Sequence, residues 1–215
     1  MSVQLILASG SPRRRELFER FWGRDRFKVL APNYDESQVP VEIRENPHAL
    51  TRYLSAGKLQ ALRDQFTLPD SCVAVAADTV VVLDEHILGK PTDQASAMDM
   101  LSRLSGRTHE VRTGLSVMLM QAPDEPIVLQ AVETTCVRFA PLDEQIIRWY
   151  VATGEPMDKA GAYGIQGHGA ALIVSIDGCY YNVMGLPVYR LMDLLRQLAG
   201  RFTSIPGLSD LLPWN

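Results

Sequence analysis

Residues 9–13 of the chain (SGSPR) combine two hydroxyl groups, a glycine and a cation, a set that suits the binding of an anion. They follow a short apolar run, residues 3–8, of the kind that forms a buried strand. Ser11 can cap the helix that follows, and Pro12 fits its first position, where an N–H would have no helical partner. The free N–H groups and the positive end of such a helix favour a phosphate. An ordinary capped helix with a solvated basic face explains the same residues.

Asp78 interrupts the most strand-like run of the sequence, residues 72–83, which is apolar nearly throughout. Such a run is typical of a strand buried on both faces. A carboxylate inside it must be paired, hydrogen-bonded or bound to a metal ion, because an isolated buried charge is very costly. Ionisable groups in such places often mark functional sites. We therefore interpret Asp78 as a functional residue.

Lys58 lies on the buried stripe of a predicted helix, four residues from Leu54 and four from Leu62. Its position fits a lysine whose stem covers apolar surface. A cation directed into a site is the alternative, and taken alone the position favours the first interpretation.

Glycine is dense in residues 158–169, where positions 161, 164, 167 and 169 are all glycine. These residues allow tight turns or the close approach of a ligand to the backbone. The spacing does not follow the dinucleotide-binding fingerprint, and no strand–helix pair brackets it.

The elements that must position these residues mix helices and strands without strict alternation. Helices are predicted to begin at Pro12, after caps at Asn46 and Thr92, near Leu142 and at Pro187. Strands are predicted over residues 3–8, 27–30, 72–83, 111–120, 128–139 and 171–176. This pattern predicts an α/β fold, with a mixed, twisted sheet flanked by helices and a central cleft. We expect one domain over residues 1–200, with two lobes around the cleft, and a C-terminal tail over residues 201–215.

Composition limits the classes of protein to which the chain can belong. Its 215 residues are 47% apolar and 21% charged, a balance typical of soluble globular proteins. The net charge of −4 argues against a nucleic-acid or anionic-membrane partner, which would favour a basic surface. Three scattered cysteines indicate reduced thiols in a cytoplasmic protein. We expect no signal peptide and no membrane span, and we interpret the four histidines as surface or loop residues.

Five motifs, in one order, resemble those of the Maf family of nucleoside triphosphate pyrophosphatases. They are LASGSPRRR (residues 7–15), ADT (77–79), LGKP (88–91), LSG (104–106) and DKAGAYGIQG (158–167). The resemblance covers residues 5–195. It implies an inosine-triphosphatase-like fold and a cytoplasmic house-cleaning enzyme that cleaves a nucleotide between its α and β phosphates. It also implies a divalent metal ion, Mg²⁺ first with Mn²⁺ or Co²⁺ as alternatives, and it suggests a homodimer.

The resemblance also assigns roles by position. It implies that Asp78 is the catalytic residue, as a base, a metal ligand or both, and that Glu36 is a second metal ligand. The positions that correspond to substrate-binding residues are Ser9, Ser11, Arg13, Lys58 and Lys90. The positions that mark the subgroup acting on dTTP and UTP, and on modified pyrimidine nucleotides, are Arg13, Thr79 and Gln166. The chain departs from many family members at Tyr53 and Gly57, where they carry an arginine and a glutamate.

The chemistry of these side chains agrees with cleavage of a triphosphate. Attack by water requires the phosphate charge to be spread, and Arg13, Lys58 and Lys90 are the available cations. Glu36 and Asp78 are hard oxygen ligands of the kind that Mg²⁺ prefers.

Two other functions stay open. A nucleotide-binding regulator, for instance of cell division, would hold a triphosphate without cleaving it. A nucleotidyltransferase also begins with a strand, a loop of small residues and arginines, but it usually needs a second pair of carboxylates. Glu36 and Asp78 are the only convincing carboxylates in this sequence, so the second pair is missing and this alternative is disfavoured.

Overall fold

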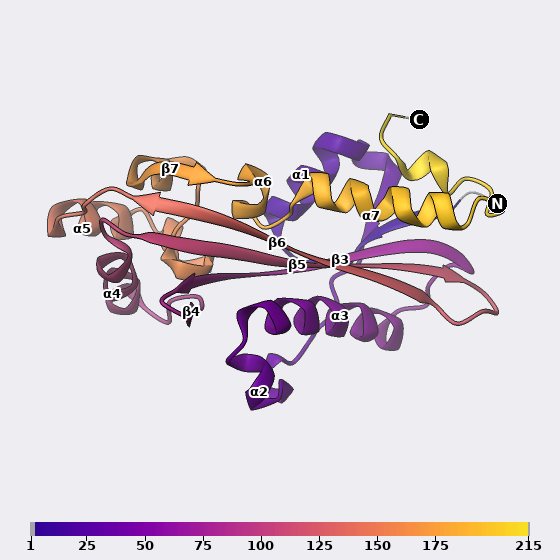
Figure 1. Cartoon of the computed structure of the whole chain (residues 1–215), viewed down its shortest axis with the longest axis horizontal. Coiled ribbons are helices and arrows are strands. Elements are labelled where there is room, and N and C mark those ends of the chain that lie inside the picture. The colour runs from indigo at the N-terminus through magenta and orange to yellow at the C-terminus, as the bar shows by residue number, and fades with distance from the viewer. Residues whose placement is uncertain (1–2, 215) are drawn as a thin grey trace.

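The computed structural model describes residues 3–214, within which the chain forms one seven-stranded mixed sheet (Figure 1). The strands are β1 (Gln4–Leu7), β2 (Phe27–Val29), β3 (Ser71–Leu83), β4 (His86–Leu88), β5 (Thr108–Gln121), β6 (Ile127–Phe139) and β7 (Ile173–Asp177). They lie in the order β2-β1-β3-β5-β6-β7, and β4 pairs with β3 beside this path. β1 runs parallel to β2 and β3, whereas the other pairs are antiparallel. The predicted α/β fold with a mixed sheet is confirmed.

Helices cover both faces of this sheet. They are α1 (Pro12–Trp22), α2 (Val41–Arg44), α3 (Pro47–Gln65), α4 (Gln94–Leu104), α5 (Glu144–Ala152), α6 (Tyr180–Val183) and α7 (Val188–Arg201). Figure 1 shows α2 and α3 on one face, α1 and α7 on the other, and α4 and α5 at one end of the sheet. Short 3₁₀ turns join them: η1 (Arg24–Arg26), η2 (Glu36–Gln38), η3 (Glu155–Asp158), η4 (Ala160–Ala162), η5 (Gly167–Leu172) and η6 (Ser209–Leu211). Among residues 3–214, no helix has the length and apolar character needed to cross a bilayer.

The alternation of side chains along the first strand divides the core between the two faces of the sheet. Leu5 and Leu7 pack in the same apolar cluster as α1 and α7. Ile6 and Ala8 point to the opposite face and pack with α3. All four side chains are buried, as expected for a strand that is covered on both faces.

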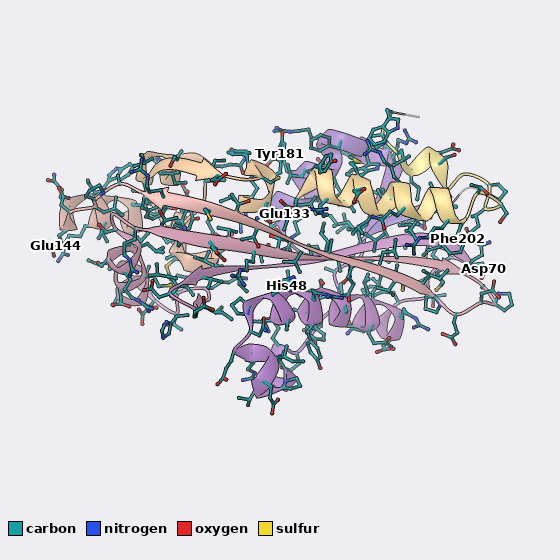
Figure 2. All side chains as sticks on the ribbon, in the orientation of Figure 1. His48, Asp70, Glu133, Glu144, Tyr181 and Phe202 are labelled. Atoms are coloured by element: carbon teal, nitrogen blue, oxygen red, sulfur yellow. The ribbon has the colours of Figure 1, made fainter. Side chains whose placement is uncertain are left out.

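The long strands β3, β5 and β6 run the length of the molecule. Asp70, just before β3, and Glu144 in α5 lie at opposite ends (Figure 2). Near the middle, Asp78 of β3 is paired in register with Gly114 of β5. A Cβ at Gly114 would lie 2.2 Å from the carbonyl oxygen of Thr51 in α3. The backbone of α3 therefore packs directly on β5, at the level of Asp78.

Several predicted element boundaries are shifted by one to three residues, and two of the shifts have a clear local cause. Thr92 does not cap α4, because the helix begins one residue later, at Gln94, and its cap is Asp93. The Asp93 carboxylate accepts a hydrogen bond from the backbone N–H of Ser96 at 2.7 Å, the bond expected of a capping residue. The strand predicted over residues 171–176 is β7, and it begins only at Ile173 because η5 extends to Leu172.

The segment after α7 packs on the core. Leu208, Leu211 and Leu212 are buried in the cluster that contains α1 and α7. The indole N–H of Trp22 donates a hydrogen bond to the carbonyl oxygen of Leu211 at 2.7 Å. The tail predicted over residues 201–215 is therefore held against α1 in the part that the structure describes.

Candidate functional site

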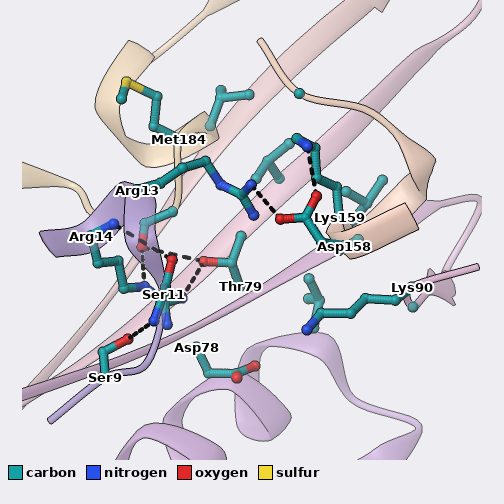
Figure 3. Close-up of a pocket in the computed structure, with 18 of the residues that line it drawn as sticks. Ser9, Ser11, Arg13, Arg14, Asp78, Thr79, Lys90, Asp158, Lys159 and Met184 are labelled. Atoms are coloured by element: carbon teal, nitrogen blue, oxygen red, sulfur yellow. Dashed lines mark hydrogen bonds and ion pairs between the residues drawn. The ribbon is translucent and has the colours of Figure 1, made fainter. Parts of the chain in front are cut away.

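A cavity of about 1100 Å³ opens beside the loop that follows β1, bounded by α3, the middle of β3 and the glycine-rich stretch (Figure 3). Every residue that the sequence assigns to a site lines this cavity: Ser9, Ser11, Arg13, Glu36, Lys58, Asp78, Thr79, Lys90 and Gln166. They come from segments that are far apart in the sequence. The fold therefore gathers all of them around one space.

The loop between β1 and α1 begins at a fixed point on the sheet. The N–H of Ala8 donates to the carbonyl oxygen of Val75 in β3 at 2.8 Å, which continues the pairing of β1 with β3 into the loop. Ser9 is buried, and its Oγ accepts a hydrogen bond from the N–H of Ser11 at 3.2 Å. The Oγ of Ser11 accepts from the N–H of Arg14 at 3.5 Å. The predicted capping role of Ser11 is confirmed, through a long contact.

Lys58 forms ion pairs with two carboxylates of the cavity. Its ammonium contacts Asp78 Oδ1 and lies 3.5 Å from Glu36 Oε1. The Lys58 side chain is 19% exposed and Asp78 is 8% exposed, so the pair is largely removed from water. The ammonium supplies the partner that a buried carboxylate requires. The Lys58 ammonium thus lies in the cavity, paired with carboxylates, and its functional role stays a prediction.

The glycine that precedes Lys58 makes room for an aromatic ring. A Cβ at Gly57 would lie 2.4 Å from the ring of Tyr34. The ring is half-buried and packs in the apolar cluster that contains Leu54, and burial raises the pKa of the Tyr34 phenol. This contact holds the segment that carries Glu36 against α3. A larger side chain at position 57 would require the Tyr34 ring to move.

Three consecutive arginines at the start of α1 have three different environments. Arg15 forms an exposed ion pair with Glu19, one turn later, at 2.9 Å. Arg13 pairs across the cavity with Asp158 at 2.9 Å. Arg14 is directed toward the sheet. Successive helical residues point about 100° apart, so three consecutive arginines must face different surroundings. Only Arg15 has a partner that the sequence indicates, because Glu19 follows it by one helical turn.

Arg14 lines the cavity, although the sequence motifs assign no individual role to it. Its Nε donates to the carbonyl oxygen of Gly185 at 2.8 Å, and its Nη2 donates to Thr79 Oγ1 at 3.0 Å. Burial lowers the pKa of the guanidinium, while the nearby charge of Asp78 raises it. The Thr79 hydroxyl also lies 2.9 Å from Thr113 Oγ1. Arg14 therefore fixes the residue that follows Asp78.

A salt bridge joins the first turn of α1 to the glycine-rich stretch. The Asp158 carboxylate accepts from Arg13 Nη1 at 2.9 Å and from Lys159 Nζ at 2.6 Å. Partial burial alone would raise the pKa of Asp158, but these hydrogen bonds outweigh it and leave the pKa below its ordinary value. Arg13 is therefore already paired, and a phosphate that contacts it has to share or replace Asp158.

The glycine-rich stretch needs its glycines because the backbone packs closely on the protein itself. A Cβ at Gly169 would lie 2.2 Å from the carbonyl oxygen of Gly164. Gly167 has a φ of +66° and leaves no room for a Cβ, which would lie 2.7 Å from Glu155 Oε2. The expectation of tight turns is confirmed. Gln166 lies between these glycines, half-buried in the cavity wall.

Lys90 lies at the end of the β3–β4 hairpin. The N–H of Gly161 donates to the carbonyl oxygen of Gly89 at 2.9 Å, which attaches the hairpin to the glycine-rich stretch. Lys90 is exposed, and Figure 3 shows its side chain extending into the cavity. It therefore forms part of a wall that faces Asp78.

One histidine prediction is wrong, because His109 is buried inside β5. Its Nε2 lies 2.7 Å from the hydroxyl of Tyr163, and its ring packs edge-on against Phe139. Burial lowers the pKa of His109 to about 4, so the ring is neutral at pH 7. The other three histidines are exposed, as expected.

The donors of the cavity fit a hard divalent cation. Within residues 3–214, no cluster of three or more histidine, cysteine or acidic side chains could hold a metal ion. Asp78 and Glu36 instead form a pair of carboxylates around one ammonium. Mg²⁺ commonly takes one or two carboxylates and completes its shell with phosphate oxygens and water. These residues therefore fit an ion that binds together with a polyphosphate.

A family match and close sequence relatives place the chain among known proteins. The family of Maf-like proteins matches residues 4–198 of the chain. A dTTP/UTP pyrophosphatase from Symbiobacterium thermophilum is 49% identical over 194 residues, which are 90% of this chain and 93% of that protein. A dTTP/UTP pyrophosphatase from Dictyoglomus thermophilum is 41% identical over 203 residues, covering 92% of this chain and 97% of that protein. A solved dITP/XTP pyrophosphatase from Mycobacterium abscessus reaches a TM-score of 0.34 at 12% identity, with 96% of this chain and 100% of that chain covered.

Proposed function

The chain belongs to the family of Maf-like proteins, and from this membership we propose that it hydrolyses dTTP and UTP to the monophosphate and pyrophosphate. The activity named for its relatives, at 41–49% identity over most of the chain, supports this substrate class. The observation that carries the proposal is the cavity in which Lys58 joins Asp78 and Glu36 beside the loop after β1.

Asp78 is the proposed general base. Its carboxylate lies in the cavity, and it can orient a water molecule or accept its proton as the water attacks the α-phosphate. Lys58 offsets the negative charge of Asp78, which would otherwise repel an approaching polyanion. Asp78 thus accepts the proton of the attacking water, and Lys58 Nζ, which contacts Asp78 Oδ1, offsets the charge of the carboxylate.

The proposed phosphate contacts lie on several walls of the cavity. The hydroxyls of Ser9 and Ser11 and the N-terminus of α1 supply neutral donors. Arg13, in the first turn of α1, and Lys90, after β4, supply charge, which suits the spread charge of a triphosphate in the transition state. Arg13 would exchange Asp158 for phosphate, or share it.

Asp78 and Glu36 are the proposed ligands of a divalent metal ion, Mg²⁺ first, with Mn²⁺ or Co²⁺ as alternatives. When bound, such an ion polarises the phosphoryl group and lowers the pKa of a coordinated water. Both carboxylates already contact Lys58, so its ammonium has to share them with the ion. A homodimer, a cytoplasmic location and the lack of nucleic-acid binding stay predictions.

A panel of nucleotides tests the proposal directly. We expect incubation with UTP or dTTP and Mg²⁺ to yield the monophosphate and pyrophosphate, resolved by chromatography. Release of inorganic phosphate instead would place the cleavage at the terminal anhydride and contradict the proposal. Binding without products would favour the nucleotide-binding regulator. A nucleotidyltransferase is disfavoured because the other cavity carboxylates, Glu155 and Asp158, are hydrogen-bonded to the glycine-rich segment.

Lys90→Ala is expected to lower kcat/KM for UTP about tenfold, through a raised KM, a lowered kcat or both. A hydrogen bond to a charged group is worth about 1.5–3 kcal/mol, and Lys90 is exposed, so the fold does not depend on it. Steady-state kinetics measures the change. Lys28→Ala, which removes an exposed lysine of β2 outside the cavity, is the matched control. A loss confined to thermal stability would make Lys90 a structural residue.

A further inference from the structure

Glu155 is a carboxylate of the cavity wall to which the sequence analysis gives no role. Its side chain is only 17% exposed. Its Oε1 accepts from the hydroxyl of Tyr150 at 3.0 Å and from the N–H of Gly169 at 3.2 Å. Its Oε2 accepts from the N–H of His168 at 2.9 Å and lies 3.2 Å from the Nδ1 of that ring. Both oxygens are occupied by the protein, so Glu155 differs from Asp78, whose partner is a single lysine.

These contacts hold the backbone on both sides of Gln166. Two residues before it, the N–H of Gly164 donates to the Tyr150 hydroxyl at 3.1 Å. Two residues after it, the N–H of His168 donates to Glu155. The Tyr150 hydroxyl and the Glu155 carboxylate are also bonded to each other. One pair of side chains therefore spans the loop that carries Gln166.

The loop is packed against this pair without spare room. A Cβ at Gly167 would lie 2.7 Å from Glu155 Oε2, and a Cβ at Gly169 would lie 2.8 Å from the Tyr150 hydroxyl. Glycines thus let the backbone approach the pair closely enough for its N–H groups to reach the two acceptors. The hydrogen bonds and the packing act on the same segment.

The pair is itself fixed to the core through α5. Tyr150 is fully buried and packs in the cluster that contains Ile147 and Val151. The hydroxyl of Thr153 donates to the carbonyl oxygen of Tyr150 at 2.6 Å and accepts from the N–H of Glu155 at 3.1 Å. The position of the loop therefore follows from the position of a buried helix.

We propose that Glu155 is a positioning residue for base recognition: with Tyr150, it holds the loop that places Gln166, and selection of a uracil or thymine ring depends on it. Such a ring presents an N–H between two carbonyl oxygens, and a glutamine amide can pair with a carbonyl and the N–H together. A displaced amide loses that match. The inference rests on the proposed function, and its first test is independent of activity.

Hydrogen exchange of the backbone amides, followed by mass spectrometry, measures the anchoring. In Glu155→Gln the new amide group presents donors to N–H groups that need acceptors. We expect exchange in residues 164–169 to rise at least tenfold, with β5 unchanged. Glu133→Gln is the matched control, because Glu133 is a similarly shielded carboxylate, 23% exposed, that pairs with Arg190 beneath α7 (Figure 2). Unchanged exchange in residues 164–169 of the Glu155 variant would overturn the inference.

Kinetics on two nucleotides measures the consequence for recognition. In Glu155→Gln we expect the ratio of kcat/KM for UTP to that for CTP to fall at least fivefold. The change should lie mainly in KM for UTP, because the Lys58–Asp78 pair is untouched. A purely structural role of Glu155 would lower kcat/KM equally for both nucleotides and leave their ratio unchanged. Tyr150→Phe removes only the hydroxyl and should shift exchange and the ratio in the same direction.

The outcomes separate the two proposals. A parent protein that does not cleave UTP would refute the proposed function, and hydrogen exchange would still decide the anchoring. A parent that prefers UTP, together with a Glu155 variant of unchanged ratio at a temperature well below its unfolding transition, would refute the role in recognition. Faster amide exchange in residues 164–169, together with a reduced ratio of kcat/KM for UTP to that for CTP, would support the whole inference.

Discussion

Asp78→Asn is expected to lower kcat for UTP at least about a hundredfold, the range in which a general base contributes to catalysis, while the fold stays intact. The amide has the size of the carboxylate but can neither accept a proton well nor act as a strong ligand of Mg²⁺. Lys58 keeps Glu36 as a partner at 3.5 Å, so the substitution does not leave its ammonium unpaired. Pyrophosphate release and the thermal unfolding transition, measured on the same sample, separate chemistry from stability.

Asp84→Asn is the matched control for that substitution. Asp84 directly follows β3, and its carboxylate accepts from Arg107 at 2.5 and 2.6 Å, but it does not line the cavity. We expect the Asp84→Asn variant to turn over UTP as fast as the parent protein does. Turnover of Asp78→Asn within a few-fold of the parent would remove Asp78 from the chemistry.

The second large effect concerns the base. UTP and dTTP are expected to be hydrolysed well and CTP poorly, by a factor of about 10 to 100 in kcat/KM for each mismatched group. Cytosine replaces the ring N–H with an acceptor and one carbonyl with an amine, and each unpaired buried group costs about 1–3 kcal/mol. The methyl group of thymine adds only apolar surface. The measurement is kcat/KM for the three nucleotides under one set of conditions.

Gln166→Glu tests whether this side chain carries the preference. The carboxylate keeps the size of the glutamine but has no donor for a carbonyl oxygen of uracil, so the preference for UTP over CTP should shrink. Gln94→Glu makes the same change at an exposed position of α4 and should leave it unaltered. Equal values for UTP and CTP in the parent would exclude base recognition by Gln166, whatever the variant does.

Local signals in the sequence were sufficient for most of the fold. The proline at position 12 and the cap at Asn46 gave the starts of α1 and α3 correctly, because both act within one turn of the helix. Thr92 and Asp93 are neighbouring residues that can both cap, and propensity does not choose between them. His109 has a polar side chain that the pattern could not place, since its burial depends on Tyr163 and Phe139 from distant segments.

The residues of the candidate site likewise fall into those that the sequence identifies and those that only the structure identifies. The five motifs contain most of the residues that the sequence assigns to it, Glu36 and Lys58 lie outside them, and the fold brings all of these residues around one cavity. Arg14, Asp158 and Glu155 had no role assigned because their contacts are made at long range or around a loop. Arg14 bonds to residues 65 and 171 positions away, and Arg13 to one 145 positions away. No periodicity or spacing encodes such partners, so only the folded chain identifies them.

The contact between Gly114 and the backbone of α3 has a consequence for how this protein can vary. Gly114 does not line the cavity, yet a side chain there would push on Thr51 and lift α3, the helix that carries Lys58, away from the strand that carries Asp78. A substitution at this position is therefore expected to disturb the charge pair as a substitution within it would. A descendant of this chain can lose its ion pair by gaining one methyl group on the neighbouring strand, with every charged residue still in place.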